Sequence, residues 1–353
     1  MAIELQSLQT IVTDTVHRRQ PTAATAATSH DTPFARIRDA ECNHCLDCVV
    51  HCPKPNILAM KGPAIGDRLY GAITLAFALF IPLLLLLITT APLVFLAWNS
   101  LQKLDLGMPW LSGFAGLENY TKMGSDPRFW NSLWLTVVYT ASTVVLQVLI
   151  GLSLALLVLQ IPRGQAVLRI AAILPIVLAP VVVGLFWRTL VLSPDVGLVD
   201  VATRGLGLGS HNWLGDPQLA LISVIAMHTW QWTPFAFLVL LATLSTLPPD
   251  VYEAARLDRA SAWQRFVYIT LPLIRPAIMM VVIMRMMTAL SAFAAIFAAT
   301  GGGPGSATEI LNLYAYRTSF TELNLGYGAS LAMVLLAITM LVSFFMFRLR
   351  RKS

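Results

Sequence analysis

The sequence predicts an all-α, polytopic membrane protein with six transmembrane helices, a cytoplasmic loop near residues 248–276 and a small irregular N-terminal segment. Of its 353 residues, 57% are hydrophobic and 12% are charged, whereas soluble domains are about half apolar and about one quarter charged. Six apolar stretches each reach the roughly 20 residues that a bilayer-crossing helix needs. Basic residues gather at the ends of these stretches, so the net charge of +6 does not indicate nucleic acid binding.

The N-terminal segment, residues 1–64, is expected to be a separate cytoplasmic domain ahead of a membrane domain over 65–353. Its first part is polar and rich in Thr and Ala. It has no apolar core of the kind that a signal peptide contains. We therefore expect a flexible tail rather than a cleaved leader.

All the cysteines of the chain lie in one motif of this segment: Cys42, Cys45, Cys48 and Cys52. The spacing resembles that of bacterial ferredoxins, whose thiolates hold a 4Fe-4S cluster. In two-cluster ferredoxins the fourth cysteine serves the other cluster, and no second motif is present here. The sequence leaves three interpretations open: a strained 4Fe-4S cluster, a zinc site that uses nearby histidines, or a remnant with four reduced thiols.

The predicted spans cover residues 71–97, 131–160, 166–190, 218–244, 276–299 and 327–347. Three prolines inside them predict kinks, because each removes a backbone hydrogen bond: Pro175, Pro180 and Pro234. Basic residues are enriched in the short link after the second span, in the 248–276 loop and at the C-terminus. The positive-inside rule therefore places both termini and this loop in the cytoplasm.

The 248–276 loop is charged although it lies between two spans. Asp250 with Glu253, and Ser261 with Gln264, have capping-box spacing, which predicts two short helices with a bend near Arg259. The second helix places three large residues on one face at i, i+3, i+4 spacing: Trp263, Phe266 and Val267. A helix pair held outside the membrane is suited to docking into a partner's groove.

This loop resembles the EAA loop of ABC importer permeases. The matching residues are Glu253, Ala254, Ala255, Asp258, Ala260, Leu271 and Pro272. The family has Gly at the bend where this chain has Arg259, and a positive φ there would cost Arg roughly 1 kcal/mol relative to Gly. The resemblance implies that these residues, with Arg259, contact an ATP-binding subunit. An ordinary amphipathic surface loop is the alternative.

The resemblance extends from about residue 65 to the C-terminus and is to carbohydrate permeases of the maltose-permease type, with a MetI-like fold. Segments 116–130 and 230–235 carry it, as does the turn Gly301, Gly302, Gly303, Pro304. It implies a bacterial inner-membrane location and four kinds of partner: a second homologous permease, a dimer of ATP-binding subunits, an extracytoplasmic sugar-binding protein and membrane lipid. The glycine-rich turn lacks the Lys-Ser/Thr of a phosphate loop, so ATP is expected on the partner subunit.

The same turn is expected on the outer side, where the binding protein would contact it. A plain reverse turn is the alternative. Arg285 lies in the middle of the fifth span, where a charge costs about 2.5–3.5 kcal/mol and usually faces a cavity or a partner. It is predicted to line the sugar pathway, with a structural ion pair or a snorkelling side chain as alternatives.

Trp230, Gln231 and Trp232 in the fourth span combine aromatic faces with a hydrogen-bonding group. Sugars suit such surfaces, so these residues are also assigned to the pathway, although aromatic residues at this spacing often serve packing. The chain is not expected to be an enzyme. A membrane iron–sulfur redox subunit is the alternative function, but His228 is the sole histidine in a span, which argues against paired haem ligands. A membrane scaffold would explain neither the loop nor the turn.

Overall fold

The computed structural model describes residues 67–161 and 164–350, which are mostly helical. The chain divides into two units, Met1–Ile81 and Pro82–Ser353. Within the described residues, five helices are long and apolar enough to cross a membrane, and a bent pair makes a sixth if it counts as one span. The fold class, an all-α polytopic membrane protein, is therefore confirmed. The predicted tail and its cysteine motif lie outside the described residues.

The long helices match most of the predicted spans. They are α3 (Asp67–Ser100), α5 (Pro127–Gln160), α9 (Pro217–Ser245), α12 (Leu271–Leu290) and α15 (Leu325–Arg350). Two of them begin at an Asp-Pro pair. Asp126 and Asp216 are the N-caps of α5 and α9, and each side chain accepts hydrogen bonds from backbone amides of the first turn.

The third predicted span is a broken helix, and the kink predicted at Pro180 is confirmed, whereas Pro175 lies inside α6. Residues 165–191 form α6 (Gln165–Val177), α7 (Pro180–Phe186) and the π-helical η3 (Trp187–Val191), with a bend of 97° at the break. Leu178 and Ala179 are extended at this point. Pro180 explains the break, because proline lacks a backbone donor and drives the residue before it out of the helical region.

The fifth predicted span, 276–299, is also wrong in its limits. An apolar helix runs over Ala262–Leu290 through α11 (Ala262–Arg265), the π-helical η4 (Phe266–Thr270) and α12. The chain then turns, and α13 (Ala294–Ala299) is a separate helix. Periodicity in a continuous apolar run does not distinguish one buried helix from two, so this break has no signal in the sequence.

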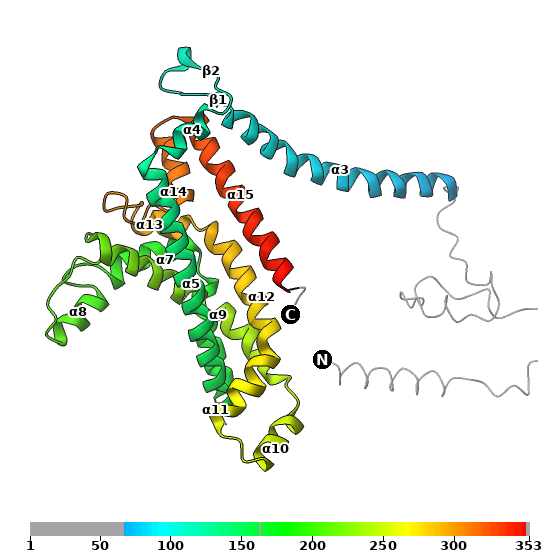
Figure 1. The fold of residues 1–353 in the computed structure, drawn as a ribbon, viewed down its shortest axis with the longest axis vertical. Coiled ribbons are helices and arrows are strands. Elements are labelled where there is room, and N and C mark those ends of the chain that lie inside the picture. Colours follow the sequence, from blue (N-terminus) through cyan, green and yellow to red (C-terminus); the bar gives the residue numbers. More distant parts are fainter. Residues whose placement is uncertain (1–66, 162–163, 351–353) are drawn as a thin grey trace, which may run out of the picture. The chain divides into compact units, whose positions relative to one another are not determined.

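Several shorter elements lie at the two ends of the second unit (Figure 1). One end carries α10 (Pro249–Leu257) and α11. The other carries α4 (Glu118–Gly124), the antiparallel pair β1 (Gln102–Lys103) and β2 (Gly113–Phe114), and α14 (Leu311–Tyr316). The remaining short elements are the 3₁₀ turn η2 (Pro109–Leu111), α8 (Leu198–Gly205) and the π-helical η5 (Arg317–Thr321).

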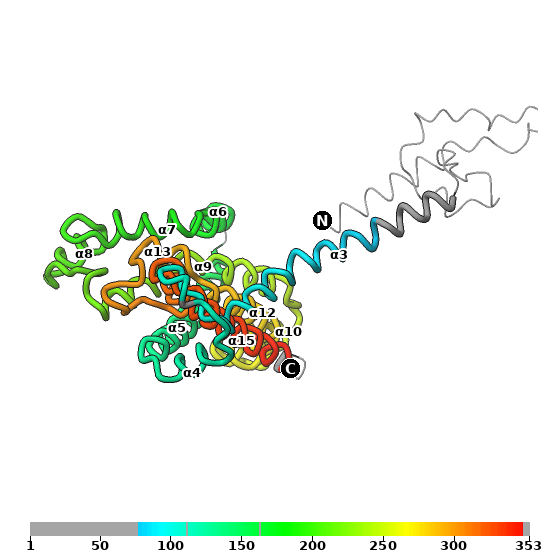
Figure 2. Tube along the Cα trace, turned by 90° about the horizontal axis from the view of Figure 1, so that it is seen from above, coloured from blue at the N-terminus to red at the C-terminus, as the bar shows by residue number. Residues whose placement is uncertain are grey.

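The centre of the unit is the packing of α5 against α9. Gly151 permits their close approach, since a Cβ there would lie 2.8 Å from Ala236 Cβ and 2.9 Å from the backbone nitrogen of Phe237. α12 packs on both helices, and α6, α7 and α8 lie along one side of this bundle (Figure 2). Side chains buried between α5, α9 and α12 therefore come from three spans that are far apart in sequence.

Candidate functional site

The 248–276 loop forms the predicted pair of short helices, α10 and α11, but only one of its two predicted capping boxes exists. Ser261 Oγ accepts from the Gln264 amide at 3.2 Å, and the Ser261 amide donates to Gln264 Oε1 at 2.8 Å. The box of Asp250 with Glu253 is wrong. Pro248 is the N-cap of α10 and has no side chain that can accept, while Pro249 starts the helix.

Arg259 makes the bend between the two helices with φ +55°. Its amide donates to the Arg256 carbonyl at 3.0 Å, and the Ala260 amide donates to the Ala255 carbonyl at 2.9 Å, which ends α10 tightly. The bend therefore requires the conformation that glycine adopts without strain, and arginine occupies it at a cost of roughly 1 kcal/mol.

Large apolar side chains of this loop are left uncovered within the chain. Leu257, Trp263 and Tyr268 are 85%, 72% and 76% exposed. The predicted coupling residues Glu253, Ala254, Asp258, Arg259, Leu271 and Pro272 are also exposed, whereas Ala255 is buried and Ala260 is half-buried. A groove of about 780 Å³ lies between α10–α11 and the adjacent ends of α5 and α9, and its lining includes Tyr252, Arg256, Trp263 and Phe266.

Arg285 on α12 is buried among polar side chains of three spans, with 2% exposure. Its Nε donates to Gln147 Oε1 of α5 at 2.8 Å, and Nη1 donates to Thr288 Oγ1 at 2.7 Å. Nη2 lies 3.5 Å from His228 Nε2 of α9. The guanidinium carbon is 4.4 Å from the centre of the Trp232 ring, a cation–π contact.

Tyr139 of α5 completes this group. Its hydroxyl lies 2.5 Å from His228 Nδ1, and the two rings stack with centroids 5.2 Å apart. The Gln147 amide nitrogen also donates to the His228 carbonyl at 3.2 Å. We call Tyr139, Gln147, His228, Trp232, Arg285 and Thr288 the Arg285 network. None of the ion pairs found in the described residues includes Arg285.

A cavity of about 280 Å³ adjoins the Arg285 network. Its lining includes Tyr139, His228, Gln231, Trp232, Thr288 and Ser291, together with residues around Phe293. Gln231 Nε2 donates to the carbonyl of Leu178 at 3.2 Å, at the break between α6 and α7. Gln231 Oε1 is buried without a hydrogen-bond partner. The structure thus gathers three of the four predicted pathway residues, Arg285, Gln231 and Trp232, in one place.

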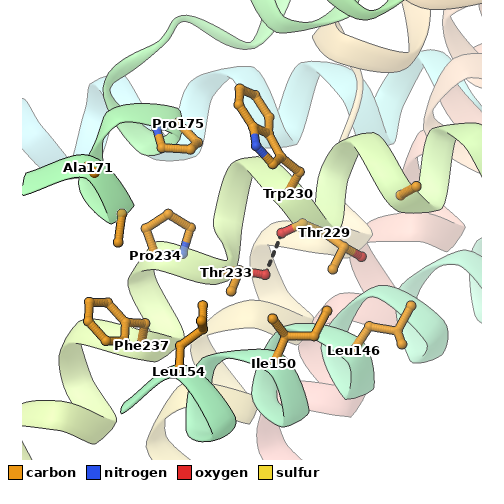
Figure 3. A pocket seen from close by; sticks show the side chains of 12 residues that line it. Leu146, Ile150, Leu154, Ala171, Pro175, Thr229, Trp230, Thr233, Pro234 and Phe237 are labelled. Atoms are coloured by element: carbon orange, nitrogen blue, oxygen red, sulfur yellow. Dashed lines mark hydrogen bonds between the residues drawn. The ribbon is translucent and has the colours of Figure 1, made fainter. Parts of the chain in front are cut away.

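Trp230, the fourth, points to a different face of α9. It lines a largely apolar cavity of about 480 Å³ between α5, α6 and α9, beside Pro175 and Pro234 (Figure 3). Its ring lies 6.2 Å from Phe186 and 5.9 Å from Trp187. Successive residues of a helix point about 100° apart, so neighbours in sequence need not share a surface.

The glycine-rich turn between α13 and α14 needs glycine at two of its predicted contact positions. Gly301 and Gly302 have φ +60° and +97°. Thr308 Oγ1 donates to the Gly303 carbonyl at 2.8 Å and lies 2.7 Å from Thr300 Oγ1, so the turn is closed by its own threonines.

A charged cluster follows this turn, and sequence reasoning did not identify it. Glu309 has a side-chain exposure of 0% and accepts from Arg128 Nε at 2.7 Å and from Arg317 Nη1 at 2.9 Å. Arg128 Nη1 also donates to Glu322 at 2.6 Å. We call Arg128, Glu309, Arg317 and Glu322 the Glu309 cluster. It joins the start of α5 to the segment after the turn.

Asp126 lies beside this cluster. Its Oδ2 accepts from the hydroxyls of Tyr314 and Tyr327, each at 2.6 Å. Burial opposes ionisation of this carboxyl, but these two hydrogen bonds and the backbone amide of Arg128 outweigh it and hold the pKa of Asp126 below its ordinary value. The N-cap carboxylate therefore stays ionised at neutral pH.

The fold is that of a membrane protein with several spans and an exposed helical loop, and comparisons with known proteins identify its family. Residues 127–353 match the family model of binding-protein-dependent transport system inner membrane components. The chain belongs to this family, and it is a multi-pass membrane permease.

Two curated relatives extend the match toward the N-terminus. The sulfoquinovosyl glycerol transport system permease of Agrobacterium fabrum is 36% identical over 279 residues, 79% of this chain and 89% of the relative. The trehalose/maltose transport system permease of Thermococcus litoralis is 35% identical over 278 residues, 78% of this chain and 92% of the relative.

A solved structure has the same fold. A chain of a bacterial ABC transporter involved in the import of the acidic polysaccharide alginate matches with a TM-score of 0.67 and 21% identity, over 81% of this chain and 99% of that chain. The fold is therefore that of an ABC importer permease, as the resemblance implied.

Proposed function

We propose that this chain is the permease subunit of an ATP-driven, binding-protein-dependent sugar importer and forms half of the translocation pathway. Membership in the family of binding-protein-dependent transport components supports the binding protein, and the sugar-transporting relatives in Agrobacterium fabrum and Thermococcus litoralis support a sugar-containing substrate. A second, homologous permease supplies the other half. ATP is bound and hydrolysed by a dimer of separate subunits, and both termini of this chain lie on the same, cytoplasmic side as α10 and α11.

The observation that carries the mechanism is the helix Ala262–Leu290, which connects the exposed loop to the buried centre. Trp263 stands at its beginning and Arg285 near its end. At 1.5 Å per residue these two positions are roughly 33 Å apart along the axis. The helix is continuous from the loop to the Arg285 network, through the π-helical η4, so a displacement of the loop is transmitted along it without an intervening break.

In this proposal Glu253, Ala255, Asp258 and Arg259 belong to the surface that the ATP-binding subunit covers. The groove beside Trp263 provides the apolar part of the contact. Closure of the ATPase dimer moves α10 and α11, and α12 moves with them relative to α5 and α9. The Arg285 network connects these three spans. Its contacts therefore change when the pathway switches its opening from one side of the membrane to the other.

The turn Gly301–Pro304 is proposed to contact the binding protein at the opposite end of the unit. Arg285, Gln231 and Trp232 are proposed to belong to the sugar pathway, because Gln231 and Trp232 line the 280 Å³ cavity and the Arg285 guanidinium lies against the Trp232 ring. Trp230 faces the separate apolar cavity and lies against Phe186 and Trp187, so we assign it to packing between α9 and the broken span.

A pull-down from native membranes tests the proposed function. Tagged wild-type chain is solubilised in detergent, and the proteins that accompany it are identified by mass spectrometry. We expect an ATP-binding subunit and a second permease with the wild type, and loss of the ATP-binding subunit with Glu253→Lys. The matched control is Glu118→Lys, a charge reversal at an exposed position of α4 at the other end of the unit.

Two outcomes would contradict the proposal. Recovery of redox subunits in place of the ATP-binding subunit would favour the iron–sulfur alternative. Equal loss of partners with Glu253→Lys and Glu118→Lys would show that the α10–α11 loop is not the specific contact. Variants at Ala255 are less informative, because its side chain is 8% exposed and a larger one would disturb the loop itself.

A further inference from the structure

The Arg285 network contains a buried cation without a compensating anion. Within residues 67–161 and 164–350, no carboxylate forms an ion pair with Arg285. Its described polar contacts are two neutral acceptors, Gln147 and Thr288, and the ring nitrogen of His228. A guanidinium carries five N–H donors, so this set uses only part of its hydrogen-bonding capacity.

An arrangement of this kind is unfavourable unless something else supplies negative charge. Buried charges in proteins are normally paired, and charges within membrane spans usually face a partner or an aqueous pathway. The Trp232 ring offers only the weaker attraction of its π face. The charge of Arg285 therefore requires an anion from outside the described residues.

The adjoining cavity has the second feature of a ligand site. Gln231 is 1% exposed, and its Oε1 has no partner. The orientation of this amide is fixed chemically, because the Leu178 carbonyl accepts only, and Nε2 must therefore be the atom that faces it. A free, buried acceptor is thus available for a ligand O–H.

Arg285 and Gln231 are both next to the 280 Å³ cavity: Gln231 lines it, and Arg285 lies behind residues that line it. Three residues that Arg285 contacts, His228, Trp232 and Thr288, line the cavity together with Gln231. The positive charge reaches the cavity across one layer of side chains, in a region of low dielectric where its field is weakly screened. The site consequently offers an anion-attracting wall and a hydroxyl-accepting oxygen.

We propose that this cavity selects an acidic sugar, a glycoside carrying a carboxylate, sulfonate or phosphate group, whose anion compensates Arg285 while a sugar hydroxyl donates to Gln231. The proposal rests on the proposed function and narrows its substrate class. A guanidinium suits this task because it stays protonated even when it is buried, so its charge persists behind the side chains that line the cavity. The competing explanation is a carboxylate of the partner permease that neutralises Arg285 in the assembled transporter.

A charge-selective labelling experiment separates these explanations. Ser291 lines the cavity and is exposed. We introduce Ser291→Cys into a chain whose four cysteines are changed to serine, and the reactivity of the new thiol reports the electrostatic potential in the cavity. The detergent-solubilised transporter is treated with the anionic 2-sulfonatoethyl or the cationic 2-trimethylammonioethyl methanethiosulfonate. Each rate is divided by that of the same reagent with free mercaptoethanol.

We expect the normalised anionic rate to exceed the cationic rate by about tenfold, as a nearby unpaired charge in partly screened surroundings requires. Arg285→Gln should bring the ratio close to one, and Arg285→Lys should preserve it. Arg275→Gln is the matched control, because Arg275 is on the same helix but exposed. Equal rates in the parent protein, or a ratio that survives Arg285→Gln, would overturn the proposal.

Protection then tests the ligand class. Glucuronate and glucose differ only in the oxidation of one carbon, and each is added at equal ionic strength before a neutral methanethiosulfonate. We expect glucuronate to slow labelling several-fold and glucose to have no effect. Protection by both, or by neither, overturns the acidic class. Both readouts use the transporter directly, so their failure beside a successful pull-down would refute this inference alone.

Discussion

Glu309 and Arg285 are both buried charged side chains, but their surroundings differ in charge balance. Glu309 is held by two arginines within 3 Å, so its negative charge is more than compensated. Arg285 has neutral polar and aromatic contacts, and no described carboxylate pairs with it. The charge of Glu309 is compensated within the chain, whereas the charge of Arg285 is not compensated by the described residues. This difference separates a cluster that fixes the fold from a network that can bind.

The largest expected effect on stability is that of a substitution at Glu309. Glu309→Gln leaves Arg128 and Arg317 without the carboxylate that joins them. Breaking a buried pair costs 3–5 kcal/mol, and we expect about 3 kcal/mol because both arginines are a third exposed. Loss of monodisperse protein after heating, measured by size-exclusion chromatography in detergent, checks this.

The control for that variant is Glu322→Gln in the same cluster. Glu322 is 44% exposed, so its ion pair with Arg128 should contribute less than about 1 kcal/mol. If both variants lower the midpoint of heat inactivation equally, burial of Glu309 is not what makes its ion pairs important.

Substitution of Arg285 should affect transport much more than stability. Arg285→Gln removes a charge that no described acid compensates, and the new amide still donates hydrogen bonds. We expect a stability loss of about 1 kcal/mol or less, the scale of one hydrogen bond, and a membrane level like that of the wild type. Uptake of the sugar that the binding protein delivers should nevertheless fall at least tenfold, measured in cells at matched membrane levels.

Two results would contradict this expectation. A stability loss as large as that of Glu309→Gln would reveal a hidden anion beside Arg285 in the free chain. Normal uptake by Arg285→Met at a normal membrane level would remove Arg285 from the sugar pathway.

The sequence predicted those helices whose ends carry local signals. For α9, the apolar run over 218–244 agrees with Pro217–Ser245, since an Asp-Pro pair caps it. The break at Leu178–Ala179 carried only Pro180 as a signal, and the end of α12 at Leu290 carried none. Apolar composition measures partition into the membrane, and it does not specify where a helix must turn to meet its neighbours.

The candidate site was predictable only where one residue is anomalous by itself. Arg285 stands out in an apolar span, but its partner Gln147 is 138 residues away. Glu309 resembled an ordinary loop residue because Arg128 is 181 residues away. Such partners are determined by tertiary packing. The cysteine motif lies outside the described residues and stays a prediction, which iron content of anaerobically purified protein, compared with Cys45→Ser, would test.

The ionisation of Asp126, beside the Glu309 cluster, predicts how the heat stability of the protein depends on pH. Its folded-state pKa is lowered, so ionisation favours the folded state, and this stability is fully present above the ordinary Asp pKa of about 4. It is lost as pH falls through the lowered folded-state pKa. We expect the heat-inactivation midpoint to be insensitive to Asp126 between pH 7 and pH 5 and to decline below about pH 4.

Asp126→Asn removes this charge and keeps an N-cap acceptor for α5, while its amide nitrogen replaces the oxygen that accepts from Tyr314 and Tyr327. The variant should be somewhat less stable at neutral pH and should lose the part of the acid-dependent decline that Asp126 causes. An unchanged decline in Asp126→Asn would mean that other carboxylates, Glu309 among them, account for the acid sensitivity.

The smallest expected effect lies at the bend of the α10–α11 loop, which neither buried cluster touches. Arg259 has φ +55°, and Arg259→Gly removes roughly 1 kcal/mol of backbone strain. Arg256→Gly is the matched control, because a glycine inside α10 costs about 1 kcal/mol. Resistance of the loop to limited proteolysis in detergent should therefore rise in the first variant and fall in the second. Equal loss of resistance in both would show that the Arg259 side chain supports the bend more than its backbone strains it.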